Sequence, residues 1–531
     1  MKTKNYVASV AILLTLAFLL VPVSSRAATF AVTNINDSGE GSLRQALTDA
    51  NSTSGSDTIS FALGSVSAAT ITLQSALPAI TEGISVEGPE STVVTVDANR
   101  TASVFVIDSP GNDQTVTMSR LVIKGADSGG LEGGGIYVGS GDTLNLADAS
   151  IESNSAGSGP GGGIFNEGTT SLTGVTITGN SAGTDGGGIY IEQGNMIVTN
   201  STISGNTADR DGGGIFYGGG VITLNHATVT NNTADNDYPA NNVGDGGGIY
   251  GASQGSRINL NNTIVAGNTD KDNGDAGSVT FAPDCVRIVS TIYSLIGIGD
   301  ACSPSFPDIN LIGSATSPID PKLSPLAGNG GFGRTHTLQS GSPAVDAGST
   351  ATQGNSVCAS TDQRGFLRPK DGDANGTARC DIGALEVGCG DSIVQSGAAE
   401  ECDDGNTTNT DSCTNSCQNA RCGDEIVGPG EGCDDANTVA TDSCTNSCQL
   451  AKCSDGIIGP NEECDDSNTT NGDGCDSSCK KEASTVEGGG SSGGAGSGST
   501  TPGGTSTAET PATDPSASPT TSGGGCTLLV R

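Results

Sequence analysis

The chain has 531 residues, with 82 glycines, no tryptophan, 3% aromatic residues and a formal net charge of -37. This length is enough for a large core and several smaller modules. Nucleic-acid binding needs a clustered basic surface, and 22 Lys plus Arg stand against 59 acids, so the composition argues against a nucleic-acid partner.

Residues 1–27 are predicted to be a signal peptide. Lys2 and Lys4 give a positively charged start, the run 10–23 is almost entirely apolar, and small residues stand at Ser25 and Ala27. A membrane anchor is the alternative, but the run is short for a span, and we expect no transmembrane helix in the mature chain. The protein is therefore expected to be exported, to the cell surface (outer membrane) or the extracellular space, where its 17 cysteines can pair.

The segment after the signal peptide is predicted to cap a stack of short strands. In 41–51 the apolar residues have helical spacing behind Ser42, a suitable N-cap. Short apolar runs then follow between residues 84 and 123, and they predict irregular coils of strands.

Three glycines, an isoleucine and an aromatic residue recur five times, starting at positions 133, 161, 186, 212 and 246. Short alternating runs follow each copy, and an asparagine ends each unit at steps of 26 residues three times and then 36. This spacing predicts an all-β parallel solenoid over 28–300, with glycines at its corners and a loop pushed out between 232 and 246. Two inward columns are expected, one of Ile136, Ile164, Ile189, Ile215 and Ile249, and a hydrogen-bonded ladder of Asn154, Asn180, Asn206, Asn232 and Asn268.

These segments resemble known families. "FAVTNINDSGEGSLRQALTDAN" and "DTISF" are similar to the start of secreted bacterial right-handed parallel β-helix proteins, and the repeats resemble those of polymorphic outer-membrane adhesins. "SPLAGNGGFGRTHTLQSGSPAVDAGS", "DQRGFLRP" and "CDIGALE" resemble the choice-of-anchor Q domain, which implies that 301–388 closes the helix. The resemblance implies surface or secreted display and brings no common activity.

No catalytic residue is predicted. Polysaccharide lyases and hydrolases also use this fold, but they need clustered acids with a basic residue on one face. The charged residues of the strict coils are assigned to solvated turns, and both histidines to structural roles: Asp185, Glu192, Asp209, Arg210, Asp211, His226 and His336. We expect a non-catalytic adhesin or structural surface protein whose partners include surface glycans. The alternative is a carbohydrate-active enzyme with its site in 60–130 or in the 232–246 loop.

A calcium site is predicted in the closing region. Asp371, Asp373 and Asn375 match the first half of an oxygen-ligand calcium loop, with Gly376 at the turn. Ile382 stands where the closing glutamate would be, so a plain polar turn is the alternative. A disulfide between Cys358 and Cys380 is expected to tie this turn, and Cys285 and Cys302 are expected to form a second disulfide.

Three cysteine-rich units follow at 389–421, 422–452 and 453–483. In an exported chain their regular spacing predicts disulfides rather than zinc, and each four-cysteine unit permits three pairings. The cysteines are Cys389, Cys402, Cys413, Cys417, Cys422, Cys433, Cys444, Cys448, Cys453, Cys464, Cys475 and Cys479. The units resemble cysteine-rich repeats of the DUF4215 kind, common in myxobacterial surface proteins.

Oxygen side chains recur at equal positions of these units and predict Ca²⁺ as a cofactor, against the alternative of a solvated acidic face. They are Asp403, Asp404, Asn406, Asp411, Asp434, Asp435, Asn437, Asp442, Asp465, Asp466, Asn468 and Asp473.

The last segment, 484–531, is predicted to be a disordered spacer because its Gly, Ser, Thr and Pro cannot bury a core. Its Gly-Gly-Cys ending resembles the start of a bacterial sorting segment, which implies that Cys526 serves as an anchor. A free or intermolecular thiol is the alternative.

Overall fold

The computed structural model describes residues 27–483 except 110, 112, 238–243, 254, 272–281, 289, 303–308, 351–356, 374, 392, 395–399 and 407. The chain divides into two units, residues 1–450 and 451–531. The predicted signal peptide up to residue 26 and the predicted spacer with Cys526 lie outside the described residues.

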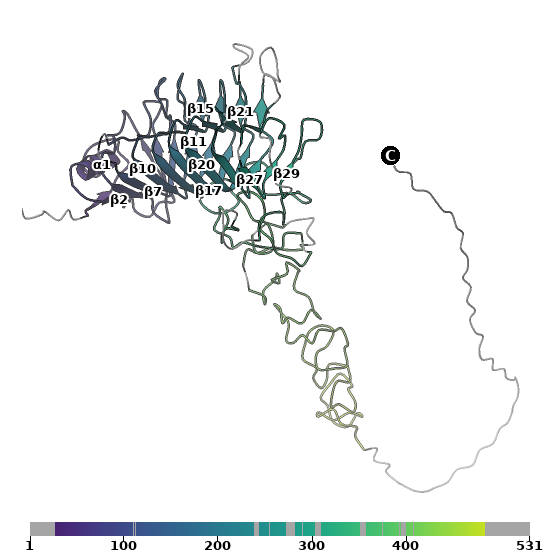
Figure 1. Ribbon diagram of the computed structural model, residues 1–531. Helices are drawn as coiled ribbons and strands as arrows, with labels where there is room; N and C mark the ends of the chain where they lie inside the picture. The colour runs from purple at the N-terminus through teal and green to yellow at the C-terminus, as the bar shows by residue number, and fades with distance from the viewer. Residues whose placement is uncertain are drawn as a thin grey trace, which may run out of the picture. The chain divides into compact units, whose positions relative to one another are not determined.

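The predicted N-terminal helix is confirmed as α1, Leu43–Asn51. The Ser42 hydroxyl accepts a hydrogen bond from the backbone N–H of Gln45, 3.2 Å away, which satisfies one of the free donors of the first turn. The apolar side of α1 is buried at Leu43, Ala46, Leu47 and Ala50. The helix packs on β1 and β2 at the N-terminal end of the solenoid, as Figure 1 shows.

A parallel β-solenoid follows, which confirms the predicted fold class. All its recorded strand pairings are parallel, and they form three sheets that we call A, B and C. Sheet B contains β6 (Phe105–Ile107), β9 (Ile136–Val138), β12 (Ile164–Asn166), β16 (Ile189–Ile191), β19 (Ile215–Tyr217), β22 (Ile249–Gly251) and β26 (Cys285–Val286). Sheet C contains β15 (Ser181–Ala182), β18 (Thr207–Ala208), β21 (Thr233–Ala234) and β25 (Thr269–Asp270).

Sheet A is the largest of the three and supplies two strands, or one long strand, to most coils. Its strands are β1 (Thr29–Val32), β2 (Asp57–Phe61), β3 (Ala68–Thr72), β4 (Ile84–Glu87), β5 (Val93–Asp97), β7 (Thr115–Ser119), β8 (Leu121–Lys124), β10 (Thr143–Ala147), β11 (Ser150–Glu152), β13 (Thr169–Thr173), β14 (Thr176–Thr178), β17 (Asn195–Ser204), β20 (Val221–Thr230), β23 (Ile258–Asn261), β24 (Ile264–Val265), β27 (Ser290–Ile292), β28 (Leu295–Ile296) and β29 (Leu311–Ile312).

Equivalent side chains of successive coils stack inside the solenoid. The five isoleucines of the predicted column are fully buried and aligned in register across sheet B. In the asparagine ladder, Oδ1 of Asn206 accepts from the backbone N–H and the side-chain amide of Asn180, at 3.0 and 2.9 Å. The ladder ends on Asp284, whose Oδ1 accepts both bonds from Asn268 at 3.0 Å.

The glycine triplets are corners, as their position in the repeat predicts. The first glycine of each triplet has a left-handed backbone, with φ between +67° and +74°. A Cβ on the second glycine would meet the next coil, as at Gly187, where it would lie 2.3 Å from the Thr207 carbonyl oxygen. Glycine therefore meets both requirements, the left-handed backbone at the first position and the close approach at the second.

The aromatic side chains of the repeat form a stack of rings on the side of sheet B opposite the isoleucine column. Neighbouring ring centroids lie 4.7 to 5.7 Å apart, and neighbouring planes are within 17° of parallel. The guanidinium of Arg287 lies over the ring of Tyr250 at 5.5 Å and covers one end of the stack. The stack consists of Tyr137, Phe165, Tyr190, Phe216 and Tyr250.

The closing segment, which we define as residues 313–387, lies against the outer side of sheet A. The Thr202 hydroxyl donates to Oε1 of Gln363 at 2.6 Å, and the Ser204 hydroxyl lies 2.9 Å from Nε2 of His336. A small apolar core, which includes Ile264, Leu338 and Ile382, joins the segment to β24 and β28. The segment therefore covers the C-terminal halves of β17 and β20 and leaves their N-terminal halves open.

The cysteine-rich units confirm the predicted disulfides. In every unit the first cysteine pairs with the fourth and the second with the third, as in Cys422–Cys448 and Cys433–Cys444. Cys285–Cys302 and Cys358–Cys380 are also present. Among the described residues of 401–483, the only buried apolar side chains are cysteines, so disulfides take the place of a hydrophobic core.

Candidate functional site

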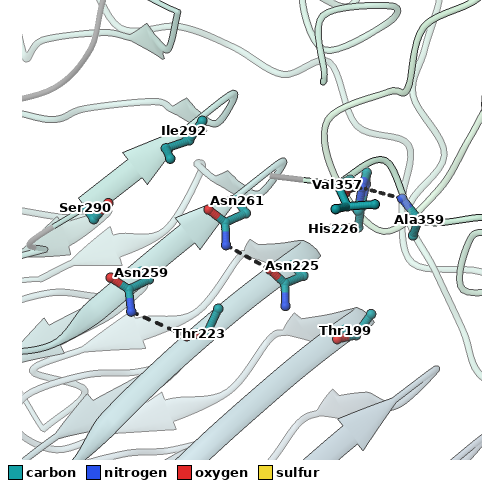
Figure 2. A pocket seen from close by; sticks show the side chains of 10 residues that line it. All are labelled: Thr199, Thr223, Asn225, His226, Asn259, Asn261, Ser290, Ile292, Val357 and Ala359. Carbon is teal, nitrogen blue, oxygen red and sulfur yellow. Dashed lines mark hydrogen bonds between the residues drawn. The ribbon is translucent and has the colours of Figure 1, made fainter. Parts of the chain in front are cut away.

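A groove of about 580 Å³ lies on the outer face of sheet A, beside the closing segment. We call it the sheet A groove, and Figure 2 shows its floor of parallel strands with the closing segment at one side. Its lining residues come from four neighbouring strands of sheet A, β17, β20, β23 and β27, and from the closing segment. They are Thr199, Thr223, Asn225, His226, Asn259, Asn261, Ser290, Ile292, Val357 and Ala359.

Strand alternation places these side chains on one face. Along β20 the apolar residues Ile222 and Leu224 point into the core, so Thr223 and Asn225 point outward. The parallel register then aligns equivalent residues of successive coils into rows. One row is Thr223, Asn259 and Ser290, and the other is Thr199, Asn225, Asn261 and Ile292.

The amides of the floor are partly bonded to each other. Nδ2 of Asn261 donates to Oδ1 of Asn225 at 2.8 Å, and Nδ2 of Asn259 lies 3.4 Å from the Thr223 hydroxyl (Figure 2). Within the described part of the chain, no hydrogen bond is recorded for the side-chain hydroxyls of Thr199 and Ser290 or for Nδ2 of Asn225. The floor therefore presents both donors and acceptors to the groove.

His226 forms the corner between the floor and the closing segment. Its backbone is left-handed, with φ of +49°, and its side chain is 1% exposed. Nε2 lies 3.2 Å from the backbone nitrogen of Ala359 and 3.2 Å from the carbonyl oxygen of Val357. Burial and the nearby charge of Arg368 lower the pKa of His226 to about 3, so the ring is neutral at physiological pH.

The groove therefore offers hydroxyl, amide and aliphatic groups. None of its ten lining residues carries a charge at neutral pH, because His226 is neutral and the other nine do not ionise in this range. Such a lining can hold a polar ligand by hydrogen bonds. An acid–base pair of the kind used for sugar cleavage is not present among these ten side chains.

The structure corrects the interpretation of the aspartates that precede the glycine triplets. The interpretation that solvation explains them is wrong for Asp185, which is 7% exposed. Its Oδ1 accepts the backbone N–H of Asp211 at 3.1 Å, and Oδ1 of Asp211 accepts that of Asp245 at 2.9 Å. Burial, offset in part by the bond from Asp245, raises the pKa of Asp211 to about 7. These residues form a second, acidic ladder next to the aromatic stack.

The predicted calcium loop of the closing segment is a hydrogen-bonded turn joined by a third acid. Carboxylate oxygens of Asp346, Asp371 and Asp373 lie within 4.8 Å of one another. Asp346 accepts the backbone N–H groups of Gly372 and Asp373 at 2.9 and 3.0 Å, and Asp371 accepts that of Gly376 at 2.7 Å. Asn375 bonds to Asp373 rather than joining a shared centre. The sequence reasoning missed Asp346, which is 25 positions or more away along the chain.

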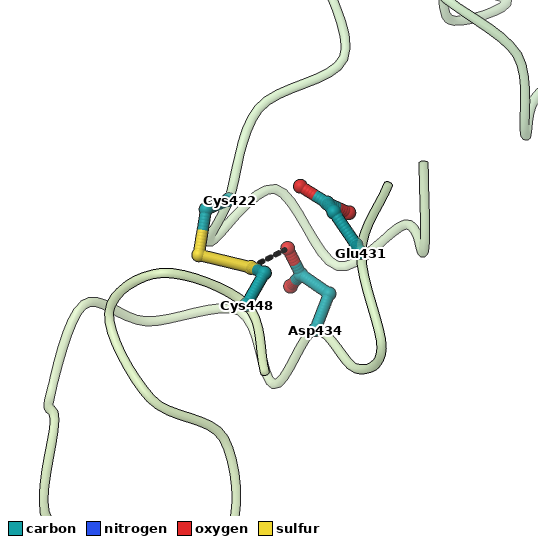
Figure 3. Close-up of side chains that lie close together, drawn as sticks. All are labelled: Cys422, Glu431, Asp434 and Cys448. Atoms are coloured by element: carbon teal, nitrogen blue, oxygen red, sulfur yellow. Dashed lines mark hydrogen bonds between the residues drawn. A yellow bond between two sulfur atoms is a disulfide. The ribbon is translucent and has the colours of Figure 1, made fainter. Parts of the chain in front are cut away.

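In the cysteine-rich units the predicted ligands separate into two environments. The first predicted ligand of each unit faces backbone donors: the carboxylate of Asp434 accepts N–H groups from Gly423, Asp424, Glu425 and Ala436 at 2.6 to 3.2 Å. Glu431 lies beside it, but the adjacent Cys422 and Cys448 are joined in a disulfide, as Figure 3 shows. Asp403 and Asp465 have equivalent bonds.

The remaining predicted ligands form exposed carboxylate pairs. In the second unit Nδ2 of Asn437 donates to Asp442 at 3.1 Å, and its Oδ1 accepts the backbone N–H of Val439. Lost hydration and the neighbouring Asp442 carboxyl raise the pKa of Asp435. The first and third units repeat the amide–carboxylate hydrogen bond, from Asn406 to Asp411 beside Asp404 and from Asn468 to Asp473 beside Asp466.

The chain is similar to a family model and to a solved structure. A domain of unknown function, DUF4215, matches residues 387–418 and 450–480. No curated protein matches the sequence. Among solved structures, the crystal structure of pectate lyase Pel9A is similar over 68% of this chain and 98% of that chain, with a TM-score of 0.32 and 12% identity. The resemblances of residues 29–388 to adhesin repeats and to the choice-of-anchor Q domain stay predictions.

In the described part of the chain, no helix is both long and apolar enough to cross a bilayer.

Proposed function

We propose that this protein is an exported surface protein that binds its ligand without catalysis, in the manner of an adhesin, through the sheet A groove. The observation that carries the proposal is the lining of the groove, which combines hydroxyl and amide groups with a buried, neutral histidine. These groups suit recognition by hydrogen bonds rather than proton transfer at neutral pH.

The rest of the chain supports export and display. Eight disulfides require an oxidising compartment, and the three cysteine-rich units depend on six of them. A net charge of -37 favours solubility and disfavours close association with other anionic surfaces. Surface glycans are the partners that this proposal addresses, and Cys526 is proposed as the anchor.

A single panel experiment tests the proposal. The oxidised full-length protein is incubated with isolated bacterial cell-envelope material and with immobilised neutral and acidic polysaccharides, with and without Ca²⁺. Retention and the release of reducing or unsaturated sugar ends are measured in the same wells. We expect retention without product.

Product release would overturn the proposal in favour of a carbohydrate-active enzyme, and its loss on chelation would identify a metal-dependent lyase. Absence of both retention and product on every surface would leave a purely structural role.

A further inference from the structure

We infer that the sheet A groove takes an uncharged, extended glycan that runs across the strands, parallel to the solenoid axis. This inference rests on the proposed function and names the ligand class of the same site. It follows from the direction of the polar rows, from their hydrogen-bonding groups and from the absence of charge among the lining residues.

The rows of the floor set the direction. Thr199, Asn225 and Asn261 are equivalent residues of three successive coils, joined by parallel register. Strands of one sheet lie about 4.8 Å apart, so a row repeats the same kind of group at this interval along the axis. An extended glycan presents hydroxyl groups at a similar interval, and a chain along the axis would meet one coil with each sugar.

The floor groups match hydroxyl chemistry. The Asn261–Asn225 bond uses one amide hydrogen and one carbonyl oxygen, which leaves Oδ1 of Asn261 as acceptor and Nδ2 of Asn225 as donor. Thr199 and Ser290 add hydroxyls that donate and accept. A sugar hydroxyl also donates and accepts, so it can satisfy this alternation of groups. Ile292 and the 37% exposed Val357 give aliphatic surface for the C–H groups of a sugar ring.

The charges favour a neutral polymer. None of the ten lining residues is cationic at neutral pH, and the chain as a whole has a net charge of -37. A polyanion would therefore be repelled at long range and would find no cation in the groove. Arg257, which directly precedes β23, is exposed but is not among the residues that line the groove.

The test uses the full-length oxidised protein in gels that contain soluble polysaccharides. The probes are neutral glucan, mannan, xylan and galactan, each paired with a carboxymethylated form of the same backbone. Asn225→Ala/Asn261→Ala removes both partners of one hydrogen bond, so neither is left buried without the other. Thr199→Tyr is a second variant that fills the groove, and Thr169→Ala is the control, exposed on the same face but outside the groove.

We expect at least one neutral polymer to retard the protein more than its charged form does. The double variant should weaken this binding at least about fivefold, since one lost hydrogen bond changes affinity by about that factor. Thr199→Tyr should weaken it as well, and Thr169→Ala should not. Melting curves identify a groove variant that fails to fold. The other groove variant then shows whether the polymer binds in the sheet A groove.

Stronger retardation by the carboxymethylated polymers would overturn the inference and leave the proposed function standing. If both groove variants fold and the polymer still retards them as much as the unaltered protein, the sheet A groove is not the binding site and the inference fails. If no polymer retards the protein and no cell-envelope material retains it, both the inference and the proposed function fail.

Discussion

A single asparagine per coil joins each turn of the solenoid to the next. Asn206 accepts two bonds from Asn180 and donates to the Ile177 carbonyl and to Asn232, at 2.9 to 3.0 Å. It is fully buried, so water cannot replace these partners. The ladder therefore fixes the corner of each coil by side-chain amides that have no solvent to compete with them.

Replacement of Asn206 by alanine should destabilise the solenoid by about 3 kcal/mol or more, because four buried groups each lose one hydrogen-bond partner. Thermal melting of the oxidised protein measures the effect. Thr207→Ala, a half-buried position of the same coil, is the matched control and should change the melting temperature little. An equal loss in both variants would contradict a special role of the ladder.

Asp211 should make the free energy of unfolding decrease as pH rises towards 7, opposite to the usual effect of a carboxyl group with a lowered pKa. Its folded-state pKa of about 7 lies above the ordinary value of 3.8, so between these values the folded state binds more protons than the unfolded state. This contribution to stability is therefore present at low pH and is lost as pH rises towards 7. Asp284, with a pKa raised to about 6 by burial, adds to the same trend, whereas the lowered pKa of His226 opposes it below pH 6.5.

We expect Asp211→Asn to raise the melting temperature at pH 7.5 by clearly more than at pH 4.5, because asparagine keeps the acceptor for Asp245 and removes the charge. Melting curves of both proteins over this range give the difference. Thr184→Ala, in the adjoining turn, should give an offset that does not vary with pH. A constant offset for Asp211→Asn would show that its carboxyl does not titrate in this range.

At the scale of elements, the closing segment and the cysteine-rich units are held by different means. The closing segment is held by its small apolar core against β24 and β28 and by polar contacts with outward threonines of sheet A. Gln363, which is 5% exposed, accepts from Thr202 at 2.6 Å and donates to Thr176 at 3.0 Å. The cysteine-rich units lack such support and depend on disulfides and on carboxylates that accept backbone N–H groups.

Gln363→Leu should loosen the closing segment without unfolding the solenoid, because Thr176 and Thr202 lose buried partners while the strands keep theirs. Hydrogen exchange should become faster in 357–373 and stay unchanged in β13 and β16. Gln339→Leu, at an exposed position of the same segment, is the control. Unchanged exchange in 357–373 would argue against the role of Gln363.

Calcium should act on the exposed carboxylate pairs of the cysteine-rich units. If Ca²⁺ binds Asp435 and Asp442, it will relieve their repulsion, and protease cleavage within 422–450 should slow on its addition and return with a chelator. Asp442→Asn should abolish this response in the second unit while the first and third keep theirs. Cleavage sites identified by mass spectrometry report each unit separately, and equal cleavage with and without chelator would contradict calcium binding.

At the scale of the whole molecule, two kinds of stability coexist in one chain. The solenoid has one continuous buried apolar cluster from Val32 to Cys302. The described residues of 401–483 bury no apolar side chain other than cysteine. Reduction of the disulfides should therefore abolish hydrogen-exchange protection in 401–483 and leave the coils between β7 and β20 protected. Equal loss in both regions would show that the solenoid depends on the disulfides.

Much of the fold was predictable because solenoid repeats are local. Each coil contacts mainly its neighbours, so the period of glycine, isoleucine and asparagine in the sequence is also the period of the structure. The asparagine ladder, the corners and the helix at 43–51 follow from this regularity and from capping chemistry. In the cysteine-rich units, spacing predicted the framework, but three pairings per unit fit it equally well.

The sequence by itself determined the coil, its inward columns and the number of cysteines that must pair. The tertiary structure alone decided which outward residues meet, because that depends on where the closing segment folds back. Asn225 and Asn261 look like any other outward polar residues of a strand, and Val357 belongs to a segment more than 90 positions away. Contacts between such distant segments carry no periodic signal, so the groove beside His226 and the buried Asp346 appeared only in three dimensions.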